Sequence, residues 1–222
     1  MKLVYQAYNH GIVIAGPMRS RKSTRNHAVM EGEYVRCSSL ELVASEILEK
    51  NIPGAVAELG VYRGEFARLI NLAFPQRKLY LFDTFSGFNE EQAREDQEKE
   101  NVRKDLLQLR RFTDTSVETV LAKMKYRENC VVIPGVFPES AVDCIEPTFA
   151  FVSLDCDLYR PIYDGLRYFY PKLSSGGYIF VHDYNNDRYA GAKQAVRQFA
   201  EEAGVAYFPL SDACGSAVIS KP

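Results

Sequence analysis

The sequence predicts an α/β protein built on one doubly wound, mostly parallel sheet of seven strands, with the last strand reversed. Three observations support this fold class. An apolar strand at residues 56–59 runs into a glycine turn and then a helical pattern, as in the open α/β sheets that bind nucleotide-like ligands. Helical patterns separate the first six predicted strands. The loop 209–215 between the last two strands is short enough to join an antiparallel pair.

Length, charge and cysteine content limit the class of protein. The 222 residues suffice for one α/β domain with a sizeable core, and a net charge of −2 with mixed signs gives no indication of a nucleic-acid partner. Five cysteines without a Cys-x-x-Cys pair suit a reducing cytosol. The first ten residues are too polar for a signal peptide, and no apolar run is long enough to span a membrane. We therefore expect a cytoplasmic protein without a membrane segment.

The N-terminal segment, residues 1–35, stands apart from the main pattern. Residues 11–15 resemble a short strand, and residues 16–23 nearly match the phosphate-binding loop Gly-x-x-x-x-Gly-Lys-Ser. Arg21 replaces the second glycine of that loop, where a bulky residue is strained, and no convincing helix follows. A basic surface segment is therefore favoured over a working P-loop. The segment could also lie over the active site, which would suit a sugar or anionic acceptor.

The remaining elements follow from apolar periodicity and helix signals. Ser38 and Glu41 form a capping box that predicts the start of a helix, and Pro53 ends that element. Residues 89–111 are densely charged, which predicts a solvated helix, and their place after Asp83 also suits a mobile lid. Further helices are expected at 116–124, 161–170 and 190–203, and further strands at 79–82, 130–133, 149–154, 178–181, 205–208 and 216–219.

The turn after the first strand has one glycine fewer than a dinucleotide fingerprint. A pyrophosphate needs three glycines for close backbone approach, whereas a ligand without phosphate needs fewer. S-adenosylmethionine is such a ligand, and Glu58 supplies negative charge near its cationic groups. Asp83, at the end of the next strand, suits a ribose contact and makes an ordinary turn the weaker alternative. The cofactor-binding residues expected are Glu58, Gly60, Tyr62, Gly64, Asp83, Thr84 and Phe137.

A second group of polar residues follows two later strands. Asp155 and Asp157 end the strand 149–154, and His182 and Asp183 end the strand 178–181. Carboxyl ends of parallel strands meet at one edge, so these groups should share a crevice with Glu58 and Asp83. Because neighbouring carboxylates raise each other's pKa, a divalent cation such as Mg²⁺ or Mn²⁺ would relieve the repulsion. The alternative is that Asp157 caps a helix and His182 is an ordinary interior histidine.

Four motifs resemble the macrocin O-methyltransferase family of bacterial natural-product sugar methyltransferases, from about residue 35 to the C-terminus. They are residues 53–64 (PGAVAELGVYRG), 81–88 (LFDTFSGF), 154–159 (LDCDLY) and 170–178 (YPKLSSGGY) leading into 182–184 (HDY). The resemblance implies the seven-stranded class I methyltransferase sheet, Asp155 and Asp183 as metal ligands, and Asp157 as general base. The family usually has two adjacent aspartates where this chain has His182 and Asp183, so histidine would be a ligand here. The family's usual substrates are macrolide or aminocoumarin sugars.

We therefore expect a methyltransferase domain at 36–222 that transfers a methyl group from S-adenosylmethionine to a sugar hydroxyl. Asp157, with Asp155, would be catalytic, and Asp155, His182 and Asp183 would hold Mg²⁺ or Mn²⁺. Three alternatives stay open: methylation of a catechol or other small diol, a non-catalytic S-adenosylmethionine-binding protein in glycan assembly, and a P-loop kinase dependent on Lys22. The expected partner is a small-molecule or sugar acceptor, and a homo-oligomer is compatible with the sequence.

Overall fold

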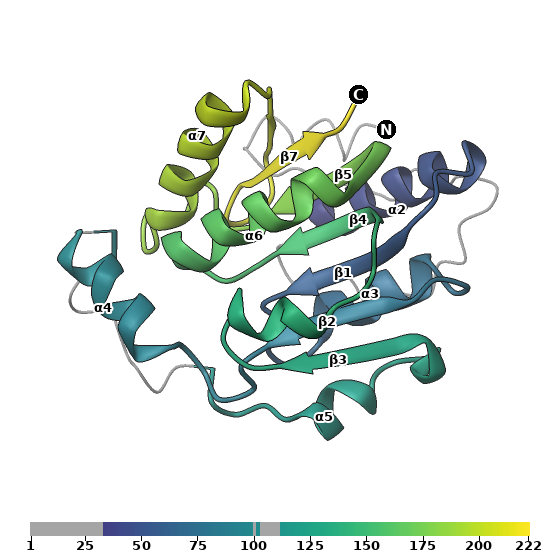
Figure 1. Ribbon diagram of the computed structural model, residues 1–222, viewed down its shortest axis with the longest axis horizontal. Helices are drawn as coiled ribbons and strands as arrows, with labels where there is room; N and C mark the ends of the chain where they lie inside the picture. Colours follow the sequence, from purple (N-terminus) through teal and green to yellow (C-terminus); the bar gives the residue numbers. More distant parts are fainter. Residues whose placement is uncertain (1–32, 100, 103–111) are drawn as a thin grey trace, which may run out of the picture.

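The computed structural model describes residues 33–99, 101–102 and 112–222. They form a seven-stranded sheet with helices packed on it (Figure 1). The strand order is β3-β2-β1-β4-β5-β7-β6. The strands are β1 (Ala55–Leu59), β2 (Leu79–Asp83), β3 (Cys130–Pro134), β4 (Phe149–Leu154), β5 (Leu173–Val181), β6 (Phe208–Leu210) and β7 (Ser216–Ser220). The first five run parallel, and β7 is antiparallel to both β5 and β6. The predicted fold class, including the reversed last strand, is confirmed.

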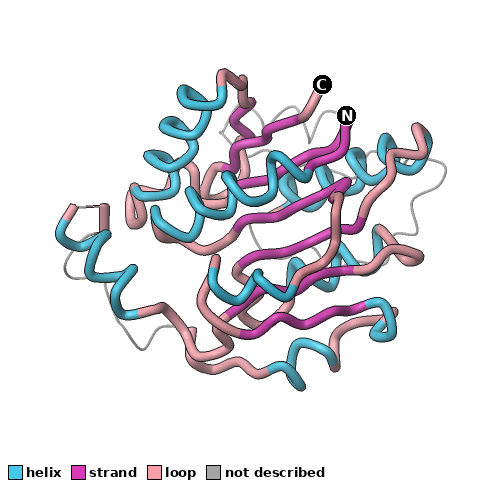
Figure 2. The backbone as a smooth tube through the Cα atoms, in the orientation of Figure 1, coloured by secondary structure: helices cyan, strands magenta, loops and turns pink. Residues whose placement is uncertain are grey.

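Helices cover both faces of the sheet (Figure 2). The helices are α2 (Tyr34–Glu49), α3 (Glu65–Ala73), α4 (Glu90–Glu98), α5 (Val117–Leu121), α6 (Tyr159–Lys172) and α7 (Gly191–Ala203), with 3₁₀ turns at Arg127–Asn129 and Glu139–Asp143. Helices α6 and α7 pack on one face, and α2 and α3 on the other (Figure 1). Strands β1 and β4 are buried along their whole length, as expected for strands covered on both sides.

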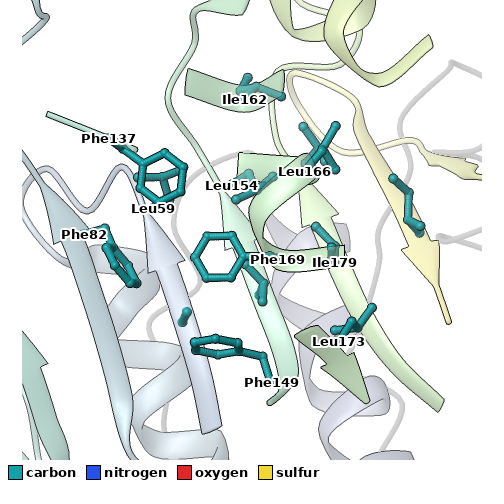
Figure 3. Packing of buried hydrophobic residues seen from close by; sticks show 14 of the residues in the cluster. Leu59, Phe82, Phe137, Phe149, Leu154, Ile162, Leu166, Phe169, Leu173 and Ile179 are labelled. Carbon is teal, nitrogen blue, oxygen red and sulfur yellow. The ribbon is translucent and has the colours of Figure 1, made fainter. Parts of the chain in front are cut away.

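The two faces carry separate apolar clusters because side chains alternate along each strand. On β1, Ala57 and Leu59 enter the cluster under α6 and α7, whereas Val56 enters the cluster under α2 and α3. Figure 3 shows the first cluster, where Phe169 of α6 lies edge-on to Phe82 at 5.6 Å between ring centroids. By the same alternation the Glu58 side chain lies on the face that α2 and α3 cover. Its neighbours in the site therefore come from that face.

Several predicted element boundaries are wrong; β5, for example, begins at Leu173, five residues before its predicted start. The helix α2 begins at Tyr34 rather than at the Ser38 capping box, and the Ser38 hydroxyl donates to the Val35 carbonyl oxygen at 3.1 Å inside the helix. The helix starts early because Arg36 already lies on its buried face. The strand β6 begins at Phe208, three residues after the predicted start, and includes Pro209. Proline is accepted there because β6 is an edge strand with one neighbour.

The charged segment after Asp83 is only partly a solvated helix. Helix α4 covers its first part and has a buried side formed by Gln92, Ala93 and Asp96. Residue 100 and residues 103–111 lie outside the described part of the chain, as do the predicted strand at 11–15 and the near match to a P-loop at 16–23. Among the described helices, none combines the length and apolar character needed to cross a membrane.

Candidate active site

A cleft of about 510 Å³ lies beyond the carboxyl ends of β1, β2, β4 and β5. Strands β1 and β4 are neighbours, and the chain leaves them toward opposite faces, so the cleft is at the switch point where open α/β sheets bind ligands. The predicted residues that line it are Glu58, Gly60, Tyr62, Asp83, Thr84, Phe137, Asp155, Asp157, His182 and Asp183. Gly64 does not line it: this residue caps α3 with φ of 76° and packs against Val120.

Gly60 permits the close approach of two chain segments rather than of a phosphate. Its φ is +87°, and a Cβ atom there would lie 2.1 Å from the carbonyl oxygen of Asp155. The Gly60 N–H donates to the Phe82 carbonyl oxygen at 2.9 Å, and the Asp155 N–H donates to the Leu59 carbonyl oxygen at 2.8 Å. Any side chain at position 60 would therefore push the ends of β1 and β4 apart.

Asp83 ties the turns after β1 and β2 together. The N–H groups of Val61 and Tyr62 donate to its Oδ2 atom at 2.7 and 2.8 Å, and the Phe85 N–H donates to Oδ1 at 2.7 Å. These three bonds orient the carboxylate in the cleft wall. A carboxylate oxygen accepts about two hydrogen bonds, so Oδ1 keeps capacity for one more donor.

Glu58 is a carboxyl group one residue before the end of the buried strand β1. Burial, acting against the attraction of Arg36, raises the pKa of Glu58 well above its usual value. Its Oε2 atom is buried and has no hydrogen-bond partner among the described residues. A cationic group bound in the cleft would satisfy this atom.

Arg36 was not predicted from the sequence. It reaches the cleft from α2: Nη1 donates to Asp155 Oδ2 at 2.9 Å, Nη2 donates to Ser153 Oγ at 3.1 Å, and Cζ lies 3.8 Å from the centre of the Phe66 ring. The side chain is only 4% exposed. A signal was available, because Arg36 shares the buried helix face with Leu40.

His182 lies between two carboxylates. Its Nδ1 atom is 3.0 Å from Asp155 Oδ1 and 2.9 Å from Asp183 Oδ2, and its Nε2 atom is 3.6 Å from Glu33 Oε2. Burial would lower the pKa of His182, but the charge of Asp155 and the hydrogen bonds with Asp155 and Asp183 together outweigh it and raise the pKa to about 12. Burial would likewise raise the pKa of Asp155, but His182 and Arg36 hold it below its usual range. The His182 imidazole and the Arg36 guanidinium therefore both lie against Asp155.

Two of the three predicted metal ligands, His182 and Asp183, are grouped with a cysteine. Within the described part of the chain, one group of at least three such residues has its donor atoms all within 4.8 Å of one another: His182, Asp183 and Cys214. Asp155 is outside this group, although it touches His182. Cys214 comes from the loop between β6 and β7, which the sequence motifs did not include.

Asp157 lies at the cleft with a left-handed backbone, φ +61°. The sequence also allowed it to be a helix cap. At the start of α6, however, the Tyr159 N–H donates to Asp96 Oδ2 of α4 at 2.8 Å. The first N–H group of α6 therefore has its acceptor in helix α4. The side chain of Asp96 is fully buried, which explains why α4 is not a freely solvated helix.

The remaining predicted cofactor-binding residues, Phe137 and Thr84, contribute to the wall of the cleft in different ways. The Phe137 ring packs into the core, stacked on Phe169 at 5.8 Å, while its carbonyl oxygen accepts from Gln92 Nε2 at 3.1 Å. The Thr84 hydroxyl donates to the Gly87 carbonyl oxygen at 2.6 Å and so shapes the turn after β2. Aromatic rings line the side next to α4; they are Tyr62, Phe88, Phe112 and Tyr189.

A model of the macrocin O-methyltransferase (TylF) family matches residues 21–218 of the chain. The chain belongs to the macrocin O-methyltransferase family. The protein is accordingly an O-methyltransferase with the class I fold that uses S-adenosylmethionine. This agrees with the crevice geometry and with the reversed last strand.

Two sequence relatives of this chain are named as O-methyltransferases. It is 27% identical to mycinamicin III 3''-O-methyltransferase of Micromonospora griseorubida, over 77% of this chain and 69% of the relative. It is 26% identical to 8-demethyl-8-(2,3-dimethoxy-α-L-rhamnosyl)-tetracenomycin-C 4'-O-methyltransferase of Streptomyces olivaceus, over 82% of this chain and 71% of the relative.

Solved structures confirm the fold of this family member. The O-methyltransferase NovP superposes with a TM-score of 0.67 at 21% identity, covering 88% of this chain and 83% of NovP. The calicheamicin methyltransferase CalS11 superposes with a TM-score of 0.65 at 19% identity, covering 86% of this chain and 80% of CalS11. At these identities the likeness concerns the fold alone.

Proposed function

We propose that the protein transfers the methyl group of S-adenosylmethionine to a hydroxyl of a sugar or glycosylated natural product. One observation carries this proposal: the glycine turn after β1 and the acidic ends of β4 and β5 line a single cleft. The first suits a cationic methyl donor, and the second suits a hydroxyl that must lose a proton. The relatives named for mycinamicin and for a rhamnosyl tetracenomycin support a sugar-bearing acceptor.

The donor is proposed to bind along the ends of β1 and β2. Glu58, Gly60 and Tyr62 would contact its methionine part, because the buried Oε2 atom of Glu58 has no hydrogen-bond partner among the described residues and can accept from the amino group of the donor. Asp83 would accept from a ribose hydroxyl with its remaining acceptor capacity, beside Thr84. The Phe137 segment would border the adenine, with Gln92 holding its backbone.

Asp157 is proposed as the general base. The acceptor oxygen attacks the methyl carbon, the bond from that carbon to sulfur breaks, and the hydroxyl proton passes to the Asp157 carboxylate. A positioned base contributes about 10²–10⁴-fold to such a step. Alignment of oxygen, carbon and sulfur contributes more, up to about 7–11 kcal/mol in favourable cases.

A divalent cation, Mg²⁺ or Mn²⁺, fits the residue types at the ends of β4 and β5, and Asp155, His182 and Asp183 would hold it. The fit rests on His182: Nδ1 lies within 3.0 Å of both carboxylates, and Nε2 is directed toward Glu33. A second carboxylate commonly orients a metal-bound histidine in this way. When bound, such a cation would lower the pKa of the acceptor hydroxyl.

The compartment is proposed to be the cytoplasm. All five cysteines lie in the described part of the chain and none forms a disulfide. Unpaired cysteines are typical of a reducing compartment.

An acceptor panel with methyl-labelled S-adenosylmethionine tests the proposal. We expect label in sugar-bearing acceptors and not in catechols or simple diols, and we expect the Asp157→Asn variant to transfer it about 10²–10⁴-fold more slowly. Label in catechols alone would favour the small-diol alternative. Binding of S-adenosylmethionine without transfer to any acceptor, together with a cellular role that survives Asp155→Ala, would favour a non-catalytic protein.

A further inference from the structure

A thiol lies beside the residues proposed to hold the cation. The Sγ atom of Cys214, a ring nitrogen of His182 and a carboxylate oxygen of Asp183 all lie within 4.8 Å of one another. Asp155 is not part of this group: its Oδ1 atom lies 3.0 Å from Nδ1 of His182, and its Oδ2 atom accepts from Arg36 Nη1 at 2.9 Å. Two of the expected ligands are thus grouped with a cysteine, while the third is paired with a protein cation.

The backbone holds the thiol in this place. The Asn185 N–H donates to the Cys214 carbonyl oxygen at 3.1 Å, and Lys193 Nζ donates to Asn185 Oδ1 at 2.8 Å. Gly215, with φ of +67°, makes the approach possible, because a Cβ atom there would lie 2.6 Å from the Cβ of Asn185. The loop between β6 and β7 is therefore packed directly on the turn that follows Asp183.

We propose that Cys214 is a metal ligand together with His182 and Asp183, and that this site takes Zn²⁺ in preference to Mg²⁺. Thiolate and imidazole donors favour zinc, whereas Mg²⁺ is bound by oxygen donors. On binding, the sulfur and the imidazole each form a bond to the metal, and their protons pass to solvent. The inference rests on the cation site of the proposed function and changes its occupant; it does not depend on the acceptor.

Cobalt titration of the full chain tests this directly. Co²⁺ substitutes for Zn²⁺, and a thiolate ligand gives a sulfur-to-cobalt charge-transfer absorption in the near ultraviolet. We expect the chelator-stripped protein to develop this absorption, and the Cys214→Ser variant to lose it and to bind Zn²⁺ about tenfold or more weakly. The Cys130→Ser variant is the matched control, because Cys130 lies in β3 and does not line the cleft; it should retain the absorption.

A wild-type Co²⁺ complex without the absorption overturns the inference, whether or not the variants fold. So does an absorption that persists in Cys214→Ser, or a wild-type protein that binds Mg²⁺ more tightly than Zn²⁺. Calorimetry with S-adenosylmethionine on the same samples separates the two proposals. Donor binding without the absorption overturns the cysteine ligand alone, whereas the absorption without donor binding overturns the proposed function alone.

Discussion

Arg36 balances the buried negative charge of the cleft. Its guanidinium lies on the Phe66 ring, pairs with Asp155 and faces the same buried region as Glu58. A buried ion pair contributes little net stability, because both charges must leave water. Removing one partner is different, since the other charge then stays buried without compensation.

The Arg36→Met variant should therefore lose unfolding free energy, up to about 3–5 kcal/mol. Methionine keeps most of the apolar contact with Phe66, so the loss reports chiefly on Asp155, which then keeps His182 as its charged neighbour. Urea denaturation measures it. Arg63→Met is the control, because Arg63 pairs with Asp114 at the exposed surface and should change stability little. Equal effects of the two variants would contradict this charge balance.

Glu58 should make stability fall as pH rises. Burial raises its pKa well above the ordinary 4.5, so the folded protein binds this proton more tightly than the unfolded chain does. Its contribution is fully present below the unfolded pKa and is lost as pH rises through the folded pKa. Without ligand, the melting temperature of Glu58→Gln minus that of wild type should therefore increase between about pH 5 and pH 8. A gap that stays constant over this range would show that Glu58 does not titrate as described.

At the scale of the elements, the close contact of β1 and β4 forms the floor of the cleft. The turn after β1 can pass the Asp155 carbonyl only because position 60 has no side chain. The same turn presents the N–H groups that hold Asp83. One glycine thus links the cofactor turn, the acidic end of β2 and the acidic end of β4.

The Gly60→Ala variant should lose S-adenosylmethionine binding, because its Cβ would lie 2.1 Å from a backbone oxygen and the turn would have to move. Gly204→Ala is a matched control. Gly204 also has positive φ, at +64°, but nothing lies within 4 Å of the added Cβ. That variant should lose roughly 1–2 kcal/mol of stability from its backbone conformation, and bind the donor normally. Calorimetry on both variants checks this; donor binding by Gly60→Ala at wild-type affinity would be inconsistent with it.

The strands were the most predictable part of the fold. Their apolar runs are buried on both faces, so composition alone marks β1, β2 and β4. The predictions were wrong where tertiary contacts decide the limits of an element. Helix α2 begins before the capping box at Ser38, with Arg36 on its buried face, and the edge strand β6 includes Pro209.

The candidate site was predictable where its residues end strands. Asp83, Asp155 and His182 follow this rule, since parallel strands bring their carboxyl ends to one edge. Arg36 and Cys214 do not follow it. The first contacts a residue 119 positions away, and the second reaches the cleft through a hairpin loop whose packing depends on Gly215.

At the scale of the whole molecule, the sheet order separates the residues proposed for the donor from those proposed for the acceptor. Strands β1 and β2 supply the turn and carboxylates proposed for the donor, while β4 and β5 supply the acidic cluster. Helix α2 joins the two halves through Arg36, and the β6–β7 hairpin closes the acidic side with Cys214. Binding of the methyl donor and removal of the acceptor proton are therefore proposed to belong to the ends of different strands.

This division is tested most directly by measuring S-adenosylmethionine binding and single-turnover methyl transfer in the same samples of wild type and Asp157→Asn. We predict that the two proteins bind the donor with equal affinity, and that transfer to a sugar-bearing acceptor slows by about 10²–10⁴-fold in the variant. Transfer by Asp157→Asn at the wild-type rate, or a wild-type protein that does not bind S-adenosylmethionine, would contradict the account.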